Sequence, residues 1–124
     1  MSDLLLRMLE DNISPTIIAE VALLLTCGPN AKQGDGRFYV YAHFGKKTGQ
    51  MFYIGKGCGS RCDQVGGRNC QWLERHDNEG GFYAVPLLSD LDEAHALATE
   101  AELIRLYALD SQLTNIAGVG HAYC

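Results

Sequence analysis

The chain from Phe38 to Ile54 alternates apolar and polar side chains with a period of two, and no other feature constrains the fold as strongly. Successive side chains of a strand point to opposite faces of a sheet, so this period predicts strands. Between the two alternating runs lies the glycine-bounded segment 45–49, which is typical of a turn. The segment therefore predicts a β-hairpin.

One face of the predicted hairpin is apolar and the other carries phenols. The apolar face consists of Phe38, Val40, Ala42, Phe44, Phe52 and Ile54. The opposite face consists of Tyr39, Tyr41, His43, Met51, Tyr53 and Gly55. With the turn centred on Lys47, Tyr41 lies directly across from Tyr53. We therefore expect two phenols side by side, on the face that does not enter the core.

A third strand and a helix are predicted after the hairpin. The strand covers Phe82 to Leu88 and ends near Pro86 and the polar Ser89. A capping box of Asp90 and Glu93 then starts a helix that reaches to about Leu109. Its apolar stripe is Ala94, Leu97, Ala98, Ala101, Ile104 and Ala108.

Another helix is predicted near the N-terminus. Ser14 and Pro15 form a good helix start, and Cys27-Gly28-Pro29 a good stop. The segment between them is apolar nearly all round, so we expect a buried helix. The sequence thus predicts an α/β (α+β) fold, with a small three-stranded antiparallel sheet, flanking helices and an N-terminal helical extension. We expect the extension and its linker at 1–34 and the main domain at 35–124.

Length and composition fit one globular domain, because the chain has 124 residues of which 47% are hydrophobic. The most apolar stretch, Ile17 to Leu25, is interrupted by Glu20 and is too short to cross a bilayer. No small-residue cleavage site follows it. We therefore expect a cytoplasmic protein without a membrane partner.

Five cysteines without a secretion signal favour free thiols over a disulfide framework. A zinc site is the alternative, although the spacings match none of the usual zinc patterns. Its ligands would be Cys58, Cys62, Cys70 and His76.

The charge of the chain is unevenly distributed. The net charge is −5, which by itself argues against a nucleic-acid partner. Between Arg37 and Arg75, however, seven basic residues face two acidic ones. This basic region includes the glycine-rich loop Gly55 to Arg61, whose Lys56 and Arg61 are suited to meet an anion. A charged face in contact only with solvent is the alternative interpretation.

Two carboxylates of the last predicted helix have different neighbours. Glu102 lies one turn from Arg105, which offers an ion pair on the solvent side. Glu100 is flanked by Ala96 and Leu103 and borders the core. Desolvating an unpaired charge is costly, so Glu100 needs a partner such as a metal ion or a cation.

Taken in order, these residues resemble the GIY-YIG endonuclease superfamily. Tyr39-Val40-Tyr41 stands in the place of GIY, and Tyr53-Ile54-Gly55 is YIG itself. Arg61, Glu100 and the segment Leu113-Thr114-Asn115 follow at matching places, so that the resemblance covers about Phe38 to Tyr123. It is greatest to the branch of the ankyrin-and-LEM-domain endonucleases and short phage or bacterial relatives, which cuts branched or distorted DNA.

The resemblance implies a metal-dependent DNA endonuclease. Tyr41 would act as general base, and Glu100 would hold one Mg²⁺ or Mn²⁺. Arg61 and Tyr53 would contact the scissile phosphate, while Lys56 would lower the pKa of the tyrosine. Asn115 would be a positioning residue. DNA-contacting residues would be Lys46, Lys47, Lys56, Arg61 and Arg68.

Some assignments have alternatives on the same residues. Tyr39 points to the same face as Tyr41 and competes with it for the role of general base, and His43 is a further candidate on that face. Arg68 is the alternative to Arg61. The alternative function is a catalytically silent nucleic-acid-binding module of the same fold. A third hypothesis is a homodimer or partner complex formed through the N-terminal helix.

Overall fold

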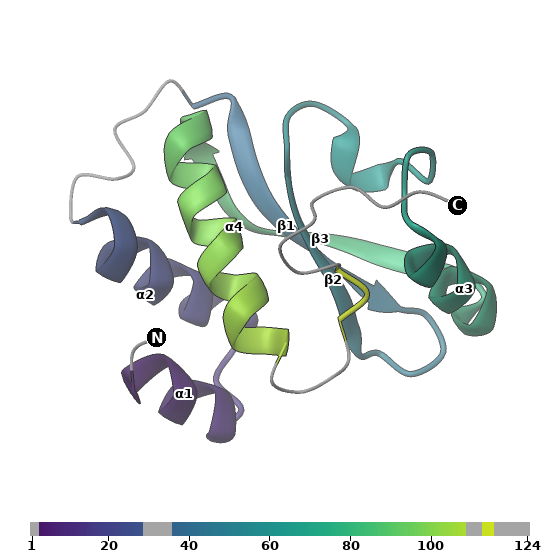
Figure 1. The fold of residues 1–124 in the computed structure, drawn as a ribbon, viewed down its shortest axis with the longest axis horizontal. Coiled ribbons are helices and arrows are strands. Elements are labelled where there is room, and N and C mark those ends of the chain that lie inside the picture. Colours follow the sequence, from purple (N-terminus) through teal and green to yellow (C-terminus); the bar gives the residue numbers. More distant parts are fainter. Residues whose placement is uncertain (1–2, 29–35, 109–112, 116–124) are drawn as a thin grey trace.

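The computed structural model describes residues 3–28, 36–108 and 113–115. Within these ranges the chain forms a small α+β fold around a three-stranded antiparallel sheet of order β2-β1-β3 (Figure 1). This confirms the predicted fold class. The elements are α1 (Asp3–Glu10), α2 (Pro15–Cys27), β1 (Phe38–Gly45), β2 (Met51–Gly57), the 3₁₀ turn η1 (Arg61–Asp63), α3 (Cys70–Glu79), β3 (Phe82–Leu91) and α4 (Glu93–Tyr107).

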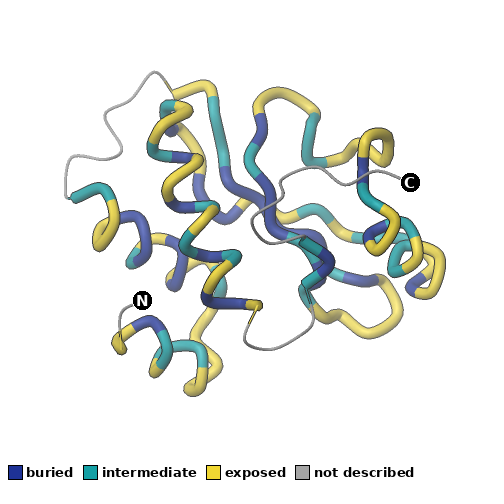
Figure 2. Tube along the Cα trace, in the orientation of Figure 1, coloured by how far each residue is buried: buried dark blue, intermediate teal, exposed yellow. Residues whose placement is uncertain are grey.

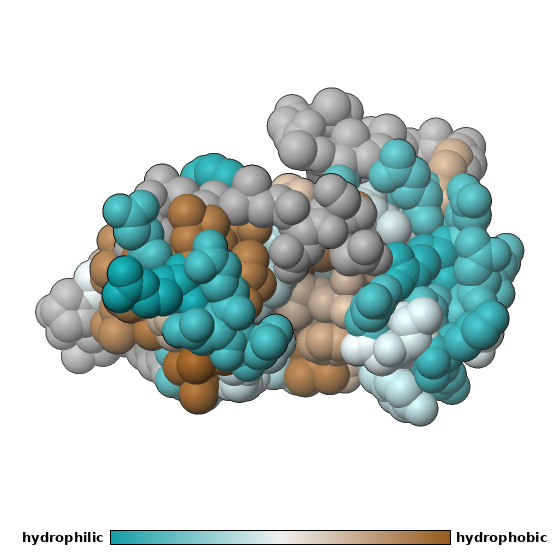
Figure 3. All heavy atoms as spheres, turned by 90° about the horizontal axis from the view of Figure 1, so that it is seen from below, coloured by the Kyte–Doolittle hydropathy of each residue, from teal (hydrophilic) through white to brown (hydrophobic). Residues whose placement is uncertain are grey.

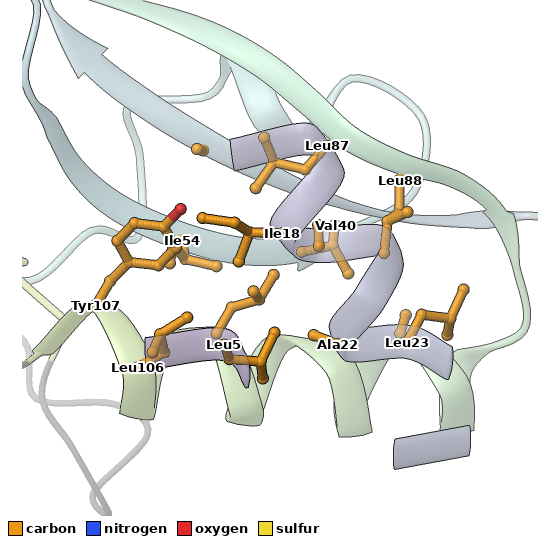
Figure 4. Packing of buried hydrophobic residues seen from close by; sticks show 14 of the residues in the cluster. Leu5, Ile18, Ala22, Leu23, Val40, Ile54, Leu87, Leu88, Leu106 and Tyr107 are labelled. Carbon is orange, nitrogen blue, oxygen red and sulfur yellow. The ribbon is translucent and has the colours of Figure 1, made fainter. Parts of the chain in front are cut away.

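The sheet lies between two helical layers. Helices α2 and α4 are on one side and α3 is on the other (Figure 1). The main core forms between the sheet and the α2/α4 layer, where Ile18 and Leu23 meet Val40, Ile54 and side chains of α4 (Figure 4). The central strand is buried along most of its length, whereas the hairpin turn is exposed (Figure 2).

The N-terminal helices belong to this same core. Leu5 of α1 and Ile18 of α2 are fully buried in it, so these two helices pack into the core that the sheet and α4 also form. The predicted start at Ser14 and Pro15 and the stop at Gly28 are confirmed. No helix in the described ranges is long and apolar enough to span a membrane.

The prediction that α2 is a buried helix is confirmed for one face only. Its buried face consists of Ile18, Ala19, Ala22 and Leu23, whereas Ile17 on the opposite face is 50% exposed. The reason is the layered architecture, because a helix in an outer layer covers the sheet with one face only.

The hairpin forms as predicted, but its register differs. Tyr41 pairs with Gly55, and Tyr53 pairs with His43. The predicted pairing of Tyr41 with Tyr53 is wrong because the turn extends to Gln50, whose carbonyl accepts a 2.9 Å hydrogen bond from the Gly45 amide. The change still leaves the tyrosines on one face, since side chains alternate with a period of two.

A β-bulge next to the turn reverses one side chain. The register between β1 and β2 shifts after His43, so that Phe44 faces Met51 and skips Phe52. A bulge places two residues opposite one. Phe52 therefore joins Tyr53 on the α3 side, where its ring lies 6.0 Å from that of Trp72. The expected place of Phe52 on the Ile54 face is wrong.

Helix α3 was not predicted, and it buries the face that was expected to lie outside the core. Asn69 caps the helix by accepting a 2.8 Å hydrogen bond from the Trp72 amide, and Gly80 ends it in the left-handed conformation. Trp72 then packs against His43 with ring centroids 5.6 Å apart. The phenol-bearing face of the sheet is thus the floor of a second, smaller core.

The last strand and helix differ from their predictions in detail. Strand β3 runs through Pro86 to Leu91, which an edge strand tolerates. The N-cap of α4 is Asp92, whose carboxylate accepts from the His95 amide, and not Asp90. The buried stripe is Ala96, Thr99, Leu103, Leu106 and Tyr107.

The predicted apolar stripe of α4 is therefore wrong, and Leu97 is 47% exposed. Alanines on both faces made two stripes plausible, and the large side chains Leu103, Leu106 and Tyr107 determine which face is buried. The predicted end near Leu109 lies outside the described residues.

Candidate active site

The phenol of Tyr41 lies at the centre of a buried cluster on the α3 side of the sheet. Tyr41 is only 1% exposed, and its oxygen accepts a 2.8 Å hydrogen bond from Nη1 of Arg68. Burial raises the pKa of Tyr41, while the hydrogen bond and the charge of Arg68 act in the opposite direction. Arg68, together with the charge of Arg61, thus opposes the effect of burial, although the pKa of Tyr41 remains raised.

Gly55 makes room for this phenol. A Cβ atom added to Gly55 would lie 2.5 Å from both Cζ and the hydroxyl oxygen of Tyr41. The glycine of Tyr53-Ile54-Gly55 is therefore required by close contact, since any side chain there would collide with the Tyr41 ring. The paired strands and this contact fix where the phenol lies.

Tyr53 is the more accessible of the two tyrosines. It is half-buried, and its ring lies 6.2 Å from that of Tyr41. The guanidinium of Arg68 lies over both rings, 5.1 Å from the Tyr53 centroid and 5.6 Å from that of Tyr41. One arginine thus connects the two phenols through cation–π and hydrogen-bond contacts.

Tyr39 binds the backbone of the loop after β2. Its hydroxyl donates to the Gly59 carbonyl over 2.7 Å and accepts from the Cys62 amide over 3.0 Å. Burial raises the pKa of Tyr39 to about 12. With both contacts made to the backbone, Tyr39 holds the loop after β2 and is poorly suited to act as a base.

His43 is held between the same loop and α3. Its Nε2–H donates to the Cys62 carbonyl over 2.6 Å, and its Nδ1 accepts from the Trp72 indole over 2.9 Å. A carbonyl only accepts and an indole N–H only donates, so His43 is the neutral Nε2–H tautomer. Burial lowers its pKa to about 4. Both ring nitrogens are therefore used, and His43 supports the site instead of offering a free base.

Arg61 and Arg68 were both expected to contact DNA, but they lie in different surroundings. Arg61 lies at the loop surface, where Nη1 donates to the Gln64 side chain and to the Gly66 carbonyl. Arg68 is buried, and besides Tyr41 it donates to the carbonyls of Gln64 and Arg61. Arg68 is consequently placed inside the protein, contrary to the expectation that it contacts DNA. Arg61 remains the surface arginine next to the cluster.

Glu100 lies on α4, the helix that packs against β2. Burial raises the pKa of the Glu100 carboxyl, and the charge and backbone amide of Lys56 partly oppose this effect. The Lys56 ammonium itself pairs with Glu93 over 2.9 Å. Glu102, in contrast, forms the predicted ion pair with Arg105 over 3.0 Å. Glu100 is thus the carboxylate of this helix that is suited to take an added cation.

The structure does not bring Glu100 into direct contact with the tyrosines among the described residues. The two groups are related through consecutive residues of β2. Gly55 lies against the Tyr41 phenol, and the next residue, Lys56, lowers the pKa of the Glu100 carboxyl. Among the described residues, no group of three or more His, Cys, Asp or Glu side chains could hold a metal ion.

Asn115 secures the outer edge of β2. Its Oδ1 accepts from the Ile54 amide over 3.0 Å, and its Nδ2 donates to the Ile54 carbonyl over 2.7 Å. Both the amide and the hydroxyl of Thr114 donate to the Phe52 carbonyl. Asn115 therefore replaces a neighbouring strand and holds the residue between Tyr53 and Gly55, as a positioning residue would.

Part of the basic region is neutralised inside the protein. Arg75 binds Glu79 over 3.0 Å, and Lys56 binds Glu93. Lys46 and Lys47 are exposed at the hairpin turn, and Arg61 is partly exposed. The surface charge that remains for a polyanion is thus concentrated at the turn and at the Arg61 loop.

The cysteines divide into two groups. Cys27, Cys58 and Cys62 are free, as predicted. Cys70 is disulfide-bonded, so the expectation of free thiols is wrong for this residue. A disulfide-bonded sulfur is not a thiolate ligand, which removes Cys70 from the alternative zinc set.

Arg68 and Trp72 are the site residues whose roles the sequence did not reveal. A usable signal was present in Asn69 and Gly80, a helix cap and a helix stop that enclose Trp72. No protein-family model, curated protein or solved structure matches the chain.

Proposed function

We propose that this protein is a metal-dependent endonuclease that hydrolyses phosphodiester bonds in DNA, with a preference for branched or distorted structures. The observation that supports the proposal is the arrangement around two consecutive residues of β2. Gly55 lies against the phenol of Tyr41, and the next residue, Lys56, lowers the pKa of the Glu100 carboxyl. The phenol of Tyr41 and the carboxyl of Glu100 are thus each next to one of two consecutive residues of β2.

The residues have complementary tasks in this proposal. Tyr41 takes a proton from the attacking water, and the hydrogen bond and charge of Arg68 oppose the burial that raises its pKa. Tyr53 and Arg61 contact the scissile phosphate, and Asn115 holds β2, the strand that carries Tyr53. The charge and the backbone amide of Lys56 favour the ionised form of Glu100, against the effect of burial.

Glu100 would hold one Mg²⁺ or Mn²⁺. Protein-bound Mg²⁺ keeps several waters and uses one or two carboxylates with the substrate phosphate, so one half-buried carboxylate is a sufficient protein ligand. When bound, the ion would neutralise charge that develops on the phosphate oxygens.

The alternative is a nucleic-acid-binding module without catalytic activity. The burial of Tyr41, which is 1% exposed and already bonded to Arg68, favours it. A general base must reach a water molecule, and a side chain that is 1% exposed offers little access to one. The two functions share the DNA partner and differ only in whether bonds are broken.

Incubation of end-labelled duplex, flap and four-way-junction DNA with the protein tests the proposal. Parallel reactions contain Mg²⁺, Mn²⁺ or EDTA. The nuclease predicts cleavage with either metal ion and none with EDTA, with branched DNA cut fastest. Binding of DNA without cleavage of any substrate would instead support the silent module.

A further inference from the structure

A hydrophobic groove lies at the hairpin-turn end of the sheet, apart from the tyrosine cluster. It has a volume of about 460 Å³, and its floor is the sheet surface that α2 leaves uncovered, made by Phe44, Tyr83, Val85 and Leu87. The first turn of α2, at Ser14 to Thr16, forms one wall. Hydrophobic surface lies between hydrophilic surfaces on this lower side of the molecule (Figure 3). Its volume is within the range of about 300 to 1,000 Å³ that is usual for small-ligand sites.

The rim of the groove carries an aromatic ring and positive charge. Tyr83 is 57% exposed, and Nζ of Lys46 lies 5.7 Å from the centroid of its ring. Lys46 and its neighbour Lys47 are both exposed. At the opposite wall, the N-cap Ser14 makes no side-chain hydrogen bond to the first turn of α2, whose N-terminal end carries the partial positive charge of the helix dipole.

These features define a ligand that is flat, apolar on its faces and negatively charged beside the ring. We infer that the groove binds an unpaired nucleotide of the DNA substrate, with the base against Tyr83 and its phosphate near Lys46. Nucleobases stack on exposed aromatic side chains whatever their sequence, and adjacent lysines follow the backbone. The inference rests on the proposed function for the identity of the partner and adds that the substrate contains unpaired bases.

Binding measured in EDTA separates this inference from nuclease activity. Fluorescence anisotropy of labelled oligothymidine and of a matched duplex is recorded at one fixed salt concentration, because phosphate contacts depend on salt. Tyr83→Ala weakens binding of the single strand by about tenfold and leaves duplex binding unchanged, as loss of one stacked base predicts. Tyr83→Phe keeps the ring and keeps the affinity.

Leu97→Ala is the matched control, because Leu97 is also an exposed hydrophobic residue but lies on α4. This variant binds both DNAs like the wild type. A second readout uses the unaltered protein: irradiation with a single strand that carries 5-iodouracil should attach it to the peptide containing Tyr83.

No measurable binding of the single strand, or equal losses with single strand and duplex in Tyr83→Ala, overturns the inference. Crosslinking only to peptides outside the groove does the same. Single-strand binding at Tyr83 without metal-dependent cleavage would overturn the proposed function and leave the groove assignment intact.

Discussion

Arg68 donates a hydrogen bond through Nη1 to the phenolic oxygen of Tyr41 over 2.8 Å, although the two residues are 27 positions apart in the chain. The arginine is buried, and its other nitrogens donate to the carbonyls of Gln64 and Arg61. A single side chain therefore joins the central strand, the loop after β2 and the start of α3. This makes Arg68 a structural centre of the tyrosine cluster.

Replacing Arg68 with methionine should lower the free energy of unfolding by about 3 kcal/mol, because it leaves the Tyr41 oxygen and two carbonyls without their charged donor. Arg61→Met is the control. Arg61 binds only exposed acceptors, so the loss there should stay below about 1 kcal/mol. Urea denaturation measures both. Equal losses in the two variants would contradict the distinction between the arginines.

Gly55→Ala should destabilise the fold by about 1 to 3 kcal/mol, because its methyl group would lie 2.5 Å from the Tyr41 hydroxyl. Gly66→Ala is the matched control, since a Cβ there meets nothing within 4 Å. Thermal unfolding compares the two variants. A wild-type melting temperature in Gly55→Ala would show that Tyr41 does not occupy this space.

Protonation of His43 should make the protein less stable in mild acid. Burial holds its pKa at about 4 in the folded state, against an ordinary value of 6.5. Between these values the unfolded chain binds a proton that the folded protein does not, so stability falls as the pH drops from 6.5 to 4. The loss amounts to about 3 kcal/mol at the lower end. Unfolding of wild type and His43→Phe across this range tests it, and an unchanged slope in the variant would contradict the assignment.

Glu79 should govern stability at lower pH. Its carboxylate accepts hydrogen bonds from Thr48, Lys47 and Arg75. These contacts lower its pKa from 4.5 to about 2, and the hydrogen bond from the Thr48 hydroxyl has the largest effect. The ionised form is favoured in the fold, so this stabilisation is complete above pH 4.5 and is lost as the pH falls towards 2.

Glu79→Gln should remove that part of the acid dependence. Glu74→Gln serves as the control because Glu74 is an exposed carboxylate of the same helix, and this variant should retain the wild-type profile. Circular dichroism at a series of acidic pH values follows the unfolding of all three proteins. Identical profiles for the Glu79 variant and the wild type would rule out the turn contact as the cause.

Local spacing in the sequence was sufficient for some features and not for others. The hairpin, the Pro15 start of α2 and the Glu102–Arg105 pair depend on neighbours in the chain, and all three were predicted. The register of the hairpin was not predicted, because Glu79 of α3 binds the turn from 31 and 32 positions away in the chain. The position of Arg68 likewise depends on the tertiary fold.

The face of α4 illustrates the same limit. Alanines at 94, 96, 98 and 101 have little preference for either face, so periodicity alone could not select the buried stripe. Glu100 was nevertheless correctly placed at the border of the core, because the stripe that is buried includes its neighbours Ala96 and Leu103. The placement of Glu100 therefore does not depend on which residues form the stripe.

The most direct test of the proposed nuclease compares Glu100→Ala with Glu102→Ala. Both glutamates are on α4, but Glu102 is paired with Arg105 and has no role in the site. In Mg²⁺, Glu100→Ala should bind branched DNA without cutting it, whereas Glu102→Ala should cut at the wild-type rate. Cleavage by Glu100→Ala at the wild-type rate would show that this carboxylate does not hold the catalytic metal ion.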